Sequence, residues 1–176
     1  MHLSVSQLER EKVRFDITYP PERIDLSGTK FRQVTGLRVT GIAELAGGSE
    51  EIRVHGHITG ELEGECDRCL EVALLAVDSD FDLYYRPAAT ASVAPEMEID
   101  EGESEIGYYE GDGVEIADVA REQVLLWLPM QWVCQADCKG ICPICGQNRN
   151  RAPCNCQQQA VDDRWSVLRH YHPEAK

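Results

Sequence analysis

Cysteines are the residues of this chain best suited to chemistry, because their thiolates are strong ligands for metal ions. The chain has 8 cysteines among its 176 residues. Two form an upstream Cys-x-x-Cys pair and six gather near the C-terminus. They are Cys66, Cys69, Cys134, Cys138, Cys142, Cys145, Cys154 and Cys156. This grouping predicts thiolate metal sites.

The segment Cys142-Pro-Ile-Cys145-Gly has the form of a metal knuckle. Two thiolates at this spacing can point at one ion, and Gly146 allows the positive φ that the turn needs. Cys154 and Cys156 follow after a short loop and can complete a tetrahedral set. The four local cysteines therefore predict a Zn²⁺ site.

The remaining four cysteines predict a second site that joins distant parts of the chain. Cys66 and Cys69 lie more than sixty residues before Cys134 and Cys138. An ion shared by these two pairs would cross-link the chain and contribute to its folding. Three alternatives stay open: iron at the same thiolates, disulfides, and cysteines that are simply buried apolar residues.

Charge limits the partners of the chain. The net charge is −14, from 17 basic and 31 acidic residues, so nucleic acid should be repelled except where positive charge is concentrated. The C-terminal part carries an excess of basic residues. Our candidates for contact with RNA or another partner are Lys139, Arg149, Arg151 and Arg164.

Several functional classes find no support in the sequence. The N-terminus lacks the apolar core of a secretory signal, and no apolar run is long enough to cross a bilayer. We therefore expect a cytoplasmic protein without membrane contact, where reducing conditions favour thiolate metal sites. The sequence contains no nucleophile elbow, phosphate-binding glycine loop or His-Glu-x-x-His. Closed sets of four cysteines are usually structural, so we expect no enzymatic activity and no small-molecule substrate.

The elements that position the cysteines are mainly strands. From residue 31 to about 87, apolar residues alternate with polar ones, which is typical of strands. Gly47-Gly48 predicts a hairpin turn, and Cys66 and Cys69 fall where a later strand ends. An amphipathic stripe at helical spacing over 115–128 predicts a helix that covers the sheet. The expected fold class is α+β, with an antiparallel β-rich sheet, a covering helix and a C-terminal zinc-knuckle tail.

These elements divide the chain into three regions. Residues 1–30 form an N-terminal segment without an assigned structure. Residues 31–133 form a β-rich core that contains an acidic loop over 87–113 and the helix over 115–128. Residues 134–176 form the cysteine-rich tail, in which 162–171 predicts a short amphipathic helix.

The order of the motifs resembles the YceD family. The resemblance rests on ECDRCLE after glycine-rich strands, a long acidic gap, REQVLLWLPMQWVC, CKGICPICGQNRN, the closing CNC and DDRW, and it covers about 31–171. By motif it carries over every cysteine except Cys134, which is added because the eight divide into two sets of four.

The resemblance implies a role in ribosome biogenesis, in which the protein is needed for 23S (large-subunit) ribosomal RNA to accumulate. The family does not define a reaction. The expected partner is therefore large-subunit ribosomal RNA or a basic ribosomal protein. Two alternatives remain: an acidic adaptor that grips a basic protein without touching RNA, and an iron-binding redox protein.

Overall fold

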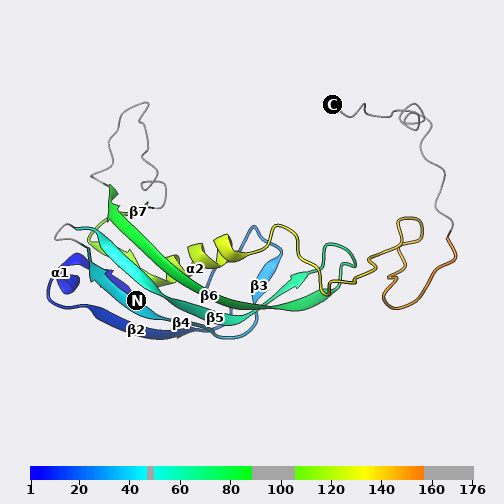
Figure 1. The fold of residues 1–176 in the computed structure, drawn as a ribbon, viewed down its shortest axis with the longest axis horizontal. Coiled ribbons are helices and arrows are strands. Elements are labelled where there is room, and N and C mark those ends of the chain that lie inside the picture. Colours follow the sequence, from blue (N-terminus) through cyan, green and yellow to red (C-terminus); the bar gives the residue numbers. More distant parts are fainter. Residues whose placement is uncertain (47–49, 89–105, 157–176) are drawn as a thin grey trace, which may run out of the picture.

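The computed structural model of the chain describes residues 1–46, 50–88 and 106–156. Its largest element is a curved six-stranded sheet with the order β2-β4-β5-β6-β7, in which β3 also pairs with β5 (Figure 1). The strands are β2 (Val13–Tyr19), β3 (Phe31–Gln33), β4 (Leu37–Leu45), β5 (Ile52–Glu65), β6 (Val72–Pro87) and β7 (Ile106–Tyr109). All neighbours are antiparallel except β6 and β7. The predicted α+β class is confirmed.

The N-terminal segment belongs to this fold. Strand β2 pairs with β4 along its whole length, from Val13 opposite Ala43 to Tyr19 opposite Leu37. Strand β1 (His2–Ser4) pairs with β8 (Gly113–Glu115) in a separate two-stranded sheet, and helix α1 (Val5–Leu8) follows β1. The sequence did not predict these elements, because charged residues interrupt the apolar pattern of this segment. In β2, for example, Arg14 and Asp16 are exposed on the outer face.

Two long hairpins place the first cysteine pair. Strands β4 and β5 pair up to Leu45 opposite Ile52, as the predicted hairpin requires, although residues 47–49 of its turn lie outside the described residues. Strands β5 and β6 pair up to Glu65 opposite Val72. Cys66 and Cys69 therefore lie in the tight turn at one end of the sheet, as predicted.

Glycines allow the sheet to pack aromatic rings across its centre. Phe15, Gly41, Gly56 and Phe81 lie opposite one another on four neighbouring strands. A Cβ on Gly41 would lie 2.7 Å from the Phe15 ring and 2.4 Å from the His55 carbonyl oxygen. The two glycines leave the space that the flanking rings occupy.

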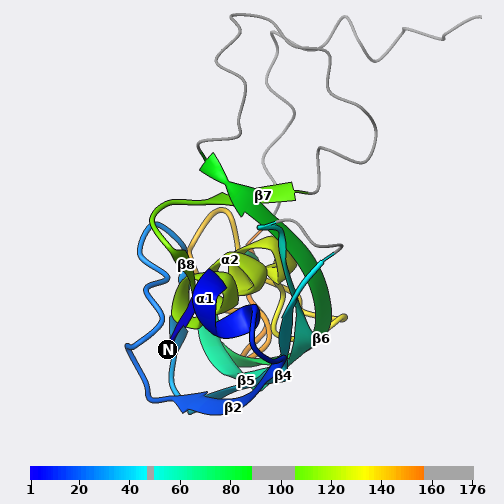
Figure 2. The same cartoon turned by 90° about the vertical axis from the view of Figure 1, so that its left-hand side faces the viewer.

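Helix α2 (Ile116–Trp127) covers the concave side of the sheet (Figure 2). Its buried residues, spaced mostly three to four apart, are Ile116, Val119, Ala120 and Val124. This stripe confirms the predicted helix and the face that it buries. Asp118 lies in the first turn, where the helix dipole favours a carboxylate. The chain leaves the helix before Pro129, which cannot continue the hydrogen-bonding pattern.

The predicted acidic loop over 87–113 is wrong in part, because β7 and the start of β8 lie within that range. Ile106 pairs with Tyr84 in a parallel register, and the buried Tyr109 donates a hydrogen bond of 2.8 Å to the Glu50 carbonyl oxygen. Strand β7 forms within this acidic stretch of the sequence because its own residues are apolar and aromatic. The predicted helix over 162–171 lies outside the described residues.

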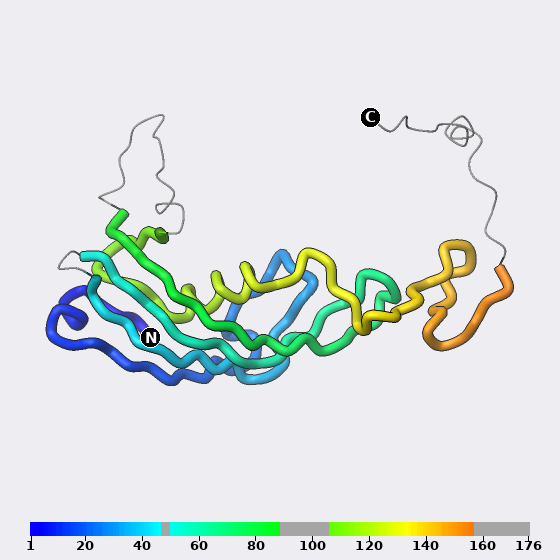
Figure 3. The backbone as a smooth tube through the Cα atoms, in the orientation of Figure 1, coloured from blue at the N-terminus to red at the C-terminus, as the bar shows by residue number. Residues whose placement is uncertain are grey.

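After α2 the chain runs along the sheet to the Cys66–Cys69 turn and then projects beyond it (Figure 3). We call residues 134–156 the arm. None of the described helices is both long and apolar enough to span a membrane.

Candidate metal centres

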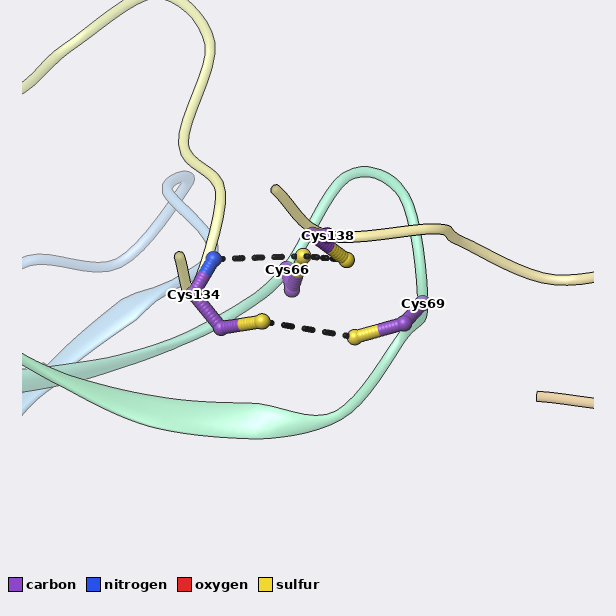
Figure 4. A group of neighbouring side chains, drawn as sticks. All are labelled: Cys66, Cys69, Cys134 and Cys138. Carbon is purple, nitrogen blue, oxygen red and sulfur yellow. Dashed lines mark hydrogen bonds between the residues drawn. The ribbon is translucent and has the colours of Figure 1, made fainter. Parts of the chain in front are cut away.

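Four cysteines from the turn and the arm form the inner cysteine set, shown in Figure 4. They are Cys66, Cys69, Cys134 and Cys138, and their sulfur atoms all lie within 4.8 Å of one another. The sulfur of Cys66 lies 3.9 Å from that of Cys138, and the sulfur of Cys69 lies 3.7 Å from that of Cys134. Residues far apart in the sequence thus offer four thiols to one point.

These distances fit a tetrahedral metal ion. A Zn–S bond of about 2.3 Å places the sulfurs of a tetrahedron about 3.8 Å apart. A disulfide requires a sulfur separation of about 2.05 Å, far shorter than the separations in this set. Four thiolates at this spacing suit zinc, and they suit a single iron equally well.

Backbone N–H groups favour the thiolate form of Cys66. Its sulfur accepts from the N–H of Arg68 at 3.5 Å and from that of Cys134 at 3.4 Å. Burial raises the pKa of Cys66, but the N–H groups of Cys134, Cys69 and Arg68 outweigh it and bring the pKa to about 6. The pKa of Cys134 is raised to about 12, mainly by burial. The inner set is therefore predisposed to supply its first thiolate from Cys66.

Hydrogen bonds join the turn to the chain that leads into the arm. Asp67 accepts from the Trp132 N–H at 2.7 Å and donates its own N–H to the Trp132 carbonyl oxygen at 2.9 Å. Lys30 forms an ion pair with Asp67, and it and the Trp132 N–H hold the pKa of that carboxyl below its usual range. Asp67 thus fixes the approach of the chain to Cys134.

Arg68 makes the next contacts with the arm. Its carbonyl oxygen accepts from the Ile141 N–H at 2.8 Å, and its guanidinium donates to the Cys138 carbonyl oxygen at 3.2 Å. Gly140 has a φ of +68° and lies against Arg68. A Cβ on Gly140 would lie 2.8 Å from the Arg68 carbonyl oxygen. This close approach requires glycine at 140.

The outer cysteine set consists of the four local cysteines of the arm. They are Cys142, Cys145, Cys154 and Cys156, and their sulfur atoms also lie within 4.8 Å of one another. Gly146 has the positive φ expected of the knuckle, +72°, and donates its N–H to the Cys142 carbonyl oxygen at 2.9 Å. The structure therefore brings the eight cysteines together in the two sets predicted from their spacing.

The electrostatics of the outer set resemble those of the inner one. The N–H groups of Cys145 and Ile144 lower the pKa of Cys142 to about 6. The pKa of Cys156 is raised to about 12, mainly by its hydrogen bond with Cys145. Each set thus contains one cysteine whose thiolate is stabilised by the backbone.

Asn150, which lies in the loop between Cys145 and Cys154, is hydrogen-bonded to the inner set. Its side-chain oxygen accepts from the Lys139 N–H at 2.8 Å, and its amide nitrogen donates to the Cys138 sulfur at 3.2 Å. A further backbone bond runs from the Arg149 N–H to the Gly140 carbonyl oxygen, at 2.9 Å. The loop that carries the predicted basic residues is therefore anchored on the inner set.

Three of the four predicted basic contact residues lie together. Lys139, Arg149 and Arg151 line one open cavity of about 420 Å³ on the arm, with Asn150 between them. Arg151 also forms an ion pair of 2.5 Å with Glu71 in the turn. The fourth, Arg164, lies outside the described residues.

Sequence reasoning missed the polar residues that orient the inner set, which are Asp67, Arg68 and Asn150. Asp67 and Arg68 lie between the cysteines of the upstream pair. Their backbone N–H and C=O groups are therefore available at the turn to a segment that packs against it. Asn150 follows Asn148 in a loop, and its N–H is bonded to the Asn148 side chain at 2.9 Å. Asparagine is common in turns, so the sequence could have indicated a turn at Asn150. The sequence does not indicate its hydrogen bonds to Lys139 and Cys138.

A protein-family model described as "Large ribosomal RNA subunit accumulation protein YceD" matches residues 54–170. The match includes most of the β5–β6 hairpin, helix α2 and all eight cysteines. No solved structure matches the chain.

Relatives in bacteria extend this match. Uncharacterized protein Rv2926c of Mycobacterium tuberculosis is 30% identical over 121 residues, which make up 68% of this chain and 55% of that protein. Uncharacterized protein Mb2951c of Mycobacterium bovis gives the same values. Uncharacterized protein YlbN of Bacillus subtilis is 23% identical over 163 residues, 92% of this chain and 89% of YlbN. The chain spans about half the length of the mycobacterial relatives.

Proposed function

The chain belongs to the YceD family of large ribosomal RNA subunit accumulation proteins, and from this membership we propose that it is a non-enzymatic assembly factor whose arm binds ribosomal RNA. The family description gives the process, which is the accumulation of large-subunit ribosomal RNA. Binding by the arm, the identity of the RNA as the direct partner, and a cytoplasmic location are parts of the proposal.

The observation that carries the proposal is the basic cavity on the arm. Lys139, Arg149 and Arg151 surround an open space large enough for a phosphate and its sugar, and Asn150 adds an amide. Guanidinium groups bind phosphate oxygens through paired hydrogen bonds, and amides can read base edges in single-stranded RNA. All three basic residues are exposed, so RNA can reach them.

The distribution of charge restricts RNA to this region. The whole chain carries a net charge of −14, and no lysine or arginine occurs between Pro87 and Ala120, a stretch that contains 10 acidic residues. RNA approaching the body of the protein would meet like charge, whereas the cavity offers Lys139 and Arg149 together with Arg151, which is paired with Glu71. Repulsion from the acidic body therefore turns the protein so that the arm faces the RNA.

The cysteine sets support a structural role for a metal. Zn²⁺ held by four thiolates would act as a cross-link, since such a closed set leaves no position for a substrate or an activated water. The inner set would fix the arm on the turn, and the outer set would fix the loop over 146–153. Both would hold the basic side chains in place without taking part in a reaction.

The test is ultraviolet cross-linking of the tagged full chain in cells, followed by identification of the attached RNA and the attached peptides. A variant with Lys139→Gln and Arg149→Gln should lose about tenfold or more of the large-subunit RNA recovered, because each lost phosphate contact weakens binding. The matched control is Arg10→Gln with Arg23→Gln, which removes the same charge from exposed positions on the body.

Equal losses in both variants would contradict binding by the arm. Recovery of ribosomal proteins attached to the body, with no RNA attached to the arm, would favour the acidic adaptor instead. Visible colour in the purified protein would indicate iron rather than zinc.

A further inference from the structure

A groove runs between helix α2 and the β6–β7 edge of the sheet, on the body of the protein and apart from the arm. Two adjoining hollows form it, with volumes of about 400 and 360 Å³. They share Tyr85 and Glu122, whose side chains meet in a hydrogen bond of 3.1 Å from the tyrosine hydroxyl to the carboxylate. On the helix the groove extends from Asp118 to Leu126, which is about 12 Å.

Carboxylates give this groove a negative charge. Its carboxylates are Asp82, Glu110, Glu115, Asp118 and Glu122, and neither lysine nor arginine lines it in the described part of the chain. His2 also lines it, and Glu115 is paired with the N-terminal ammonium group. Asp82 is paired with Arg53 at 2.7 Å. Among the described residues, the carboxylates of Glu110 and Asp118 have no hydrogen-bond or ion-pair partner, and the only partner of the Glu122 carboxylate is the Tyr85 hydroxyl. Cationic side chains would therefore find free carboxylates in the groove.

Apolar and aromatic side chains at the rim are left open to solvent. Leu126 is 74% exposed and lines one hollow, and Tyr108 is 50% exposed and lines the other. A tyrosine ring attracts the charged end of a lysine or arginine, and an exposed leucine can pack against its aliphatic stem. The groove therefore suits long basic side chains better than compact inorganic cations.

The groove also opens onto an unpaired strand edge. Strand β7 begins at Ile106 opposite Tyr84, so residues 72–83 of β6 have no strand beside them on that side within the described residues. Asp82 and Leu83 on this edge line the groove. Free N–H and C=O groups of an edge strand can pair with an added extended segment.

We propose that this groove binds an extended segment of a partner protein that is rich in lysine and arginine. RNA is excluded by the charge of the groove, and a second copy of the chain would bring like charges together. Residues 89–105 of the chain itself contain six acidic residues and no basic one, so they are also poor occupants. The proposal does not rest on RNA binding by the arm.

The experiment measures binding of a fluorescent synthetic peptide, about ten residues long, with alternating Lys or Arg and Val, to the full-length protein. A peptide with Gln in place of each basic residue is the probe control. The variant Asp118→Asn with Glu122→Gln should bind the basic peptide about tenfold more weakly, since it removes two close charge pairs. The matched variant Glu9→Gln with Glu11→Gln removes equal charge from an exposed turn outside the groove and should change the affinity less than about twofold.

A photoreactive version of the peptide gives the location of binding. Attachment to α2, β6 or β7 supports the proposal, and attachment to the arm overturns it. Equal weakening in the two variants, equal binding of the Gln peptide, or no binding would each overturn it as well.

Two further results would assign the groove to another occupant. A carbodiimide cross-link from Lys176 to Glu122 in the peptide-free protein would show that the chain's own C-terminus fills it. Ultraviolet cross-linking of a short single-stranded RNA to α2, β6 or β7 in the peptide-free protein would show that RNA binds there. Either result would refute the assignment to a basic partner protein.

Discussion

The two cysteine sets offer the same ligands but differ in what they connect. The inner set joins the turn between β5 and β6 to a segment that lies 65 to 72 residues later in the chain. The outer set joins residues of one short loop. Cys66 is 0% exposed and Cys69 is 4% exposed, whereas Cys145 and Cys156 are exposed. The inner set therefore determines where the arm lies, and the outer set determines only how the arm is folded.

The largest expected effect comes from removing the inner set. Cys66→Ser with Cys69→Ser should lower the free energy of unfolding by about 3 kcal/mol or more, because it leaves buried hydroxyl groups and removes two of the four thiolates that would hold the proposed metal ion. For a chain of this size that corresponds to a melting temperature at least about 6 °C lower, measured by circular dichroism of the sheet.

Cys142→Ser with Cys145→Ser is the matched variant at the outer set. It should shift the melting temperature of the sheet by less than about 2 °C while making the arm sensitive to protease. Equal shifts for the two variants would remove the distinction between the sets.

After metal removal, the cysteines of the two sets should be alkylated at different rates. With a chelator and an alkylating reagent, we expect Cys145 and Cys156 to be modified about tenfold faster than Cys66 and Cys69, since the inner thiols require local opening. Mass spectrometry of the modified peptides measures the order. Modification of all eight cysteines at one rate would contradict the difference in protection.

Acid should release the metal from both sets. The folded protein lowers the pKa of Cys66 and Cys142 from 9.0 to about 6, so their thiolates are favoured above that pH. A lowered pKa adds stability that is fully present above the unfolded value and is lost as the pH falls through the folded value. We therefore expect metal to be retained at pH 7 and released only below about pH 6, because a bound ion stabilises the thiolates further against protonation. Metal content after dialysis at each pH measures the release.

Two glycines compare the junction between arm and turn, at Gly140, with the knuckle of the outer set, at Gly146. Both Gly140 and Gly146 have positive φ, but only at Gly140 would an added Cβ lie within 3 Å of a backbone atom, the Arg68 carbonyl oxygen. Gly146→Ala should cost about 1 kcal/mol from backbone strain alone, and Gly140→Ala should cost more because the arm must also move off the turn. Chemical denaturation measures both, and equal costs would show that the contact with Arg68 is unimportant.

The smallest effect is expected at the ion pair between Arg151 and Glu71. Arg151 is largely exposed, and such pairs contribute about 0.5 kcal/mol. Glu71→Gln should therefore leave the melting temperature within about 2 °C of the original value. Its use is as a control, because it frees Arg151 without changing the arm's basic residues.

The sequence predicted the features that depend on local spacing. Alternation over β4 and β5, the stripe of α2 and the knuckle around Gly146 each follow from a period or a short motif. Even the long-range pairing of Cys66 with Cys138 followed, because four local cysteines left four others for a second set.

Features that depend on packing could not be predicted in this way. The parallel return of β7 is stabilised by the burial of Tyr109 and its bond to Glu50, neither of which has a local signal. The contacts of Arg68 and Asn150 depend on how the arm meets the turn. The curvature that brings Glu122 of α2 to Tyr85 of β6, and so forms the groove, arises only when the whole sheet is assembled.

Native mass spectrometry of the whole chain, purified under reducing conditions, counts the metal ions that each chain carries. We expect two metal ions on each chain, one of which is lost in the Cys66→Ser variant and the other in the Cys142→Ser variant. A chain that carries no ion and still keeps the arm on the turn, as judged by protection of Cys138 from alkylation, would contradict the account.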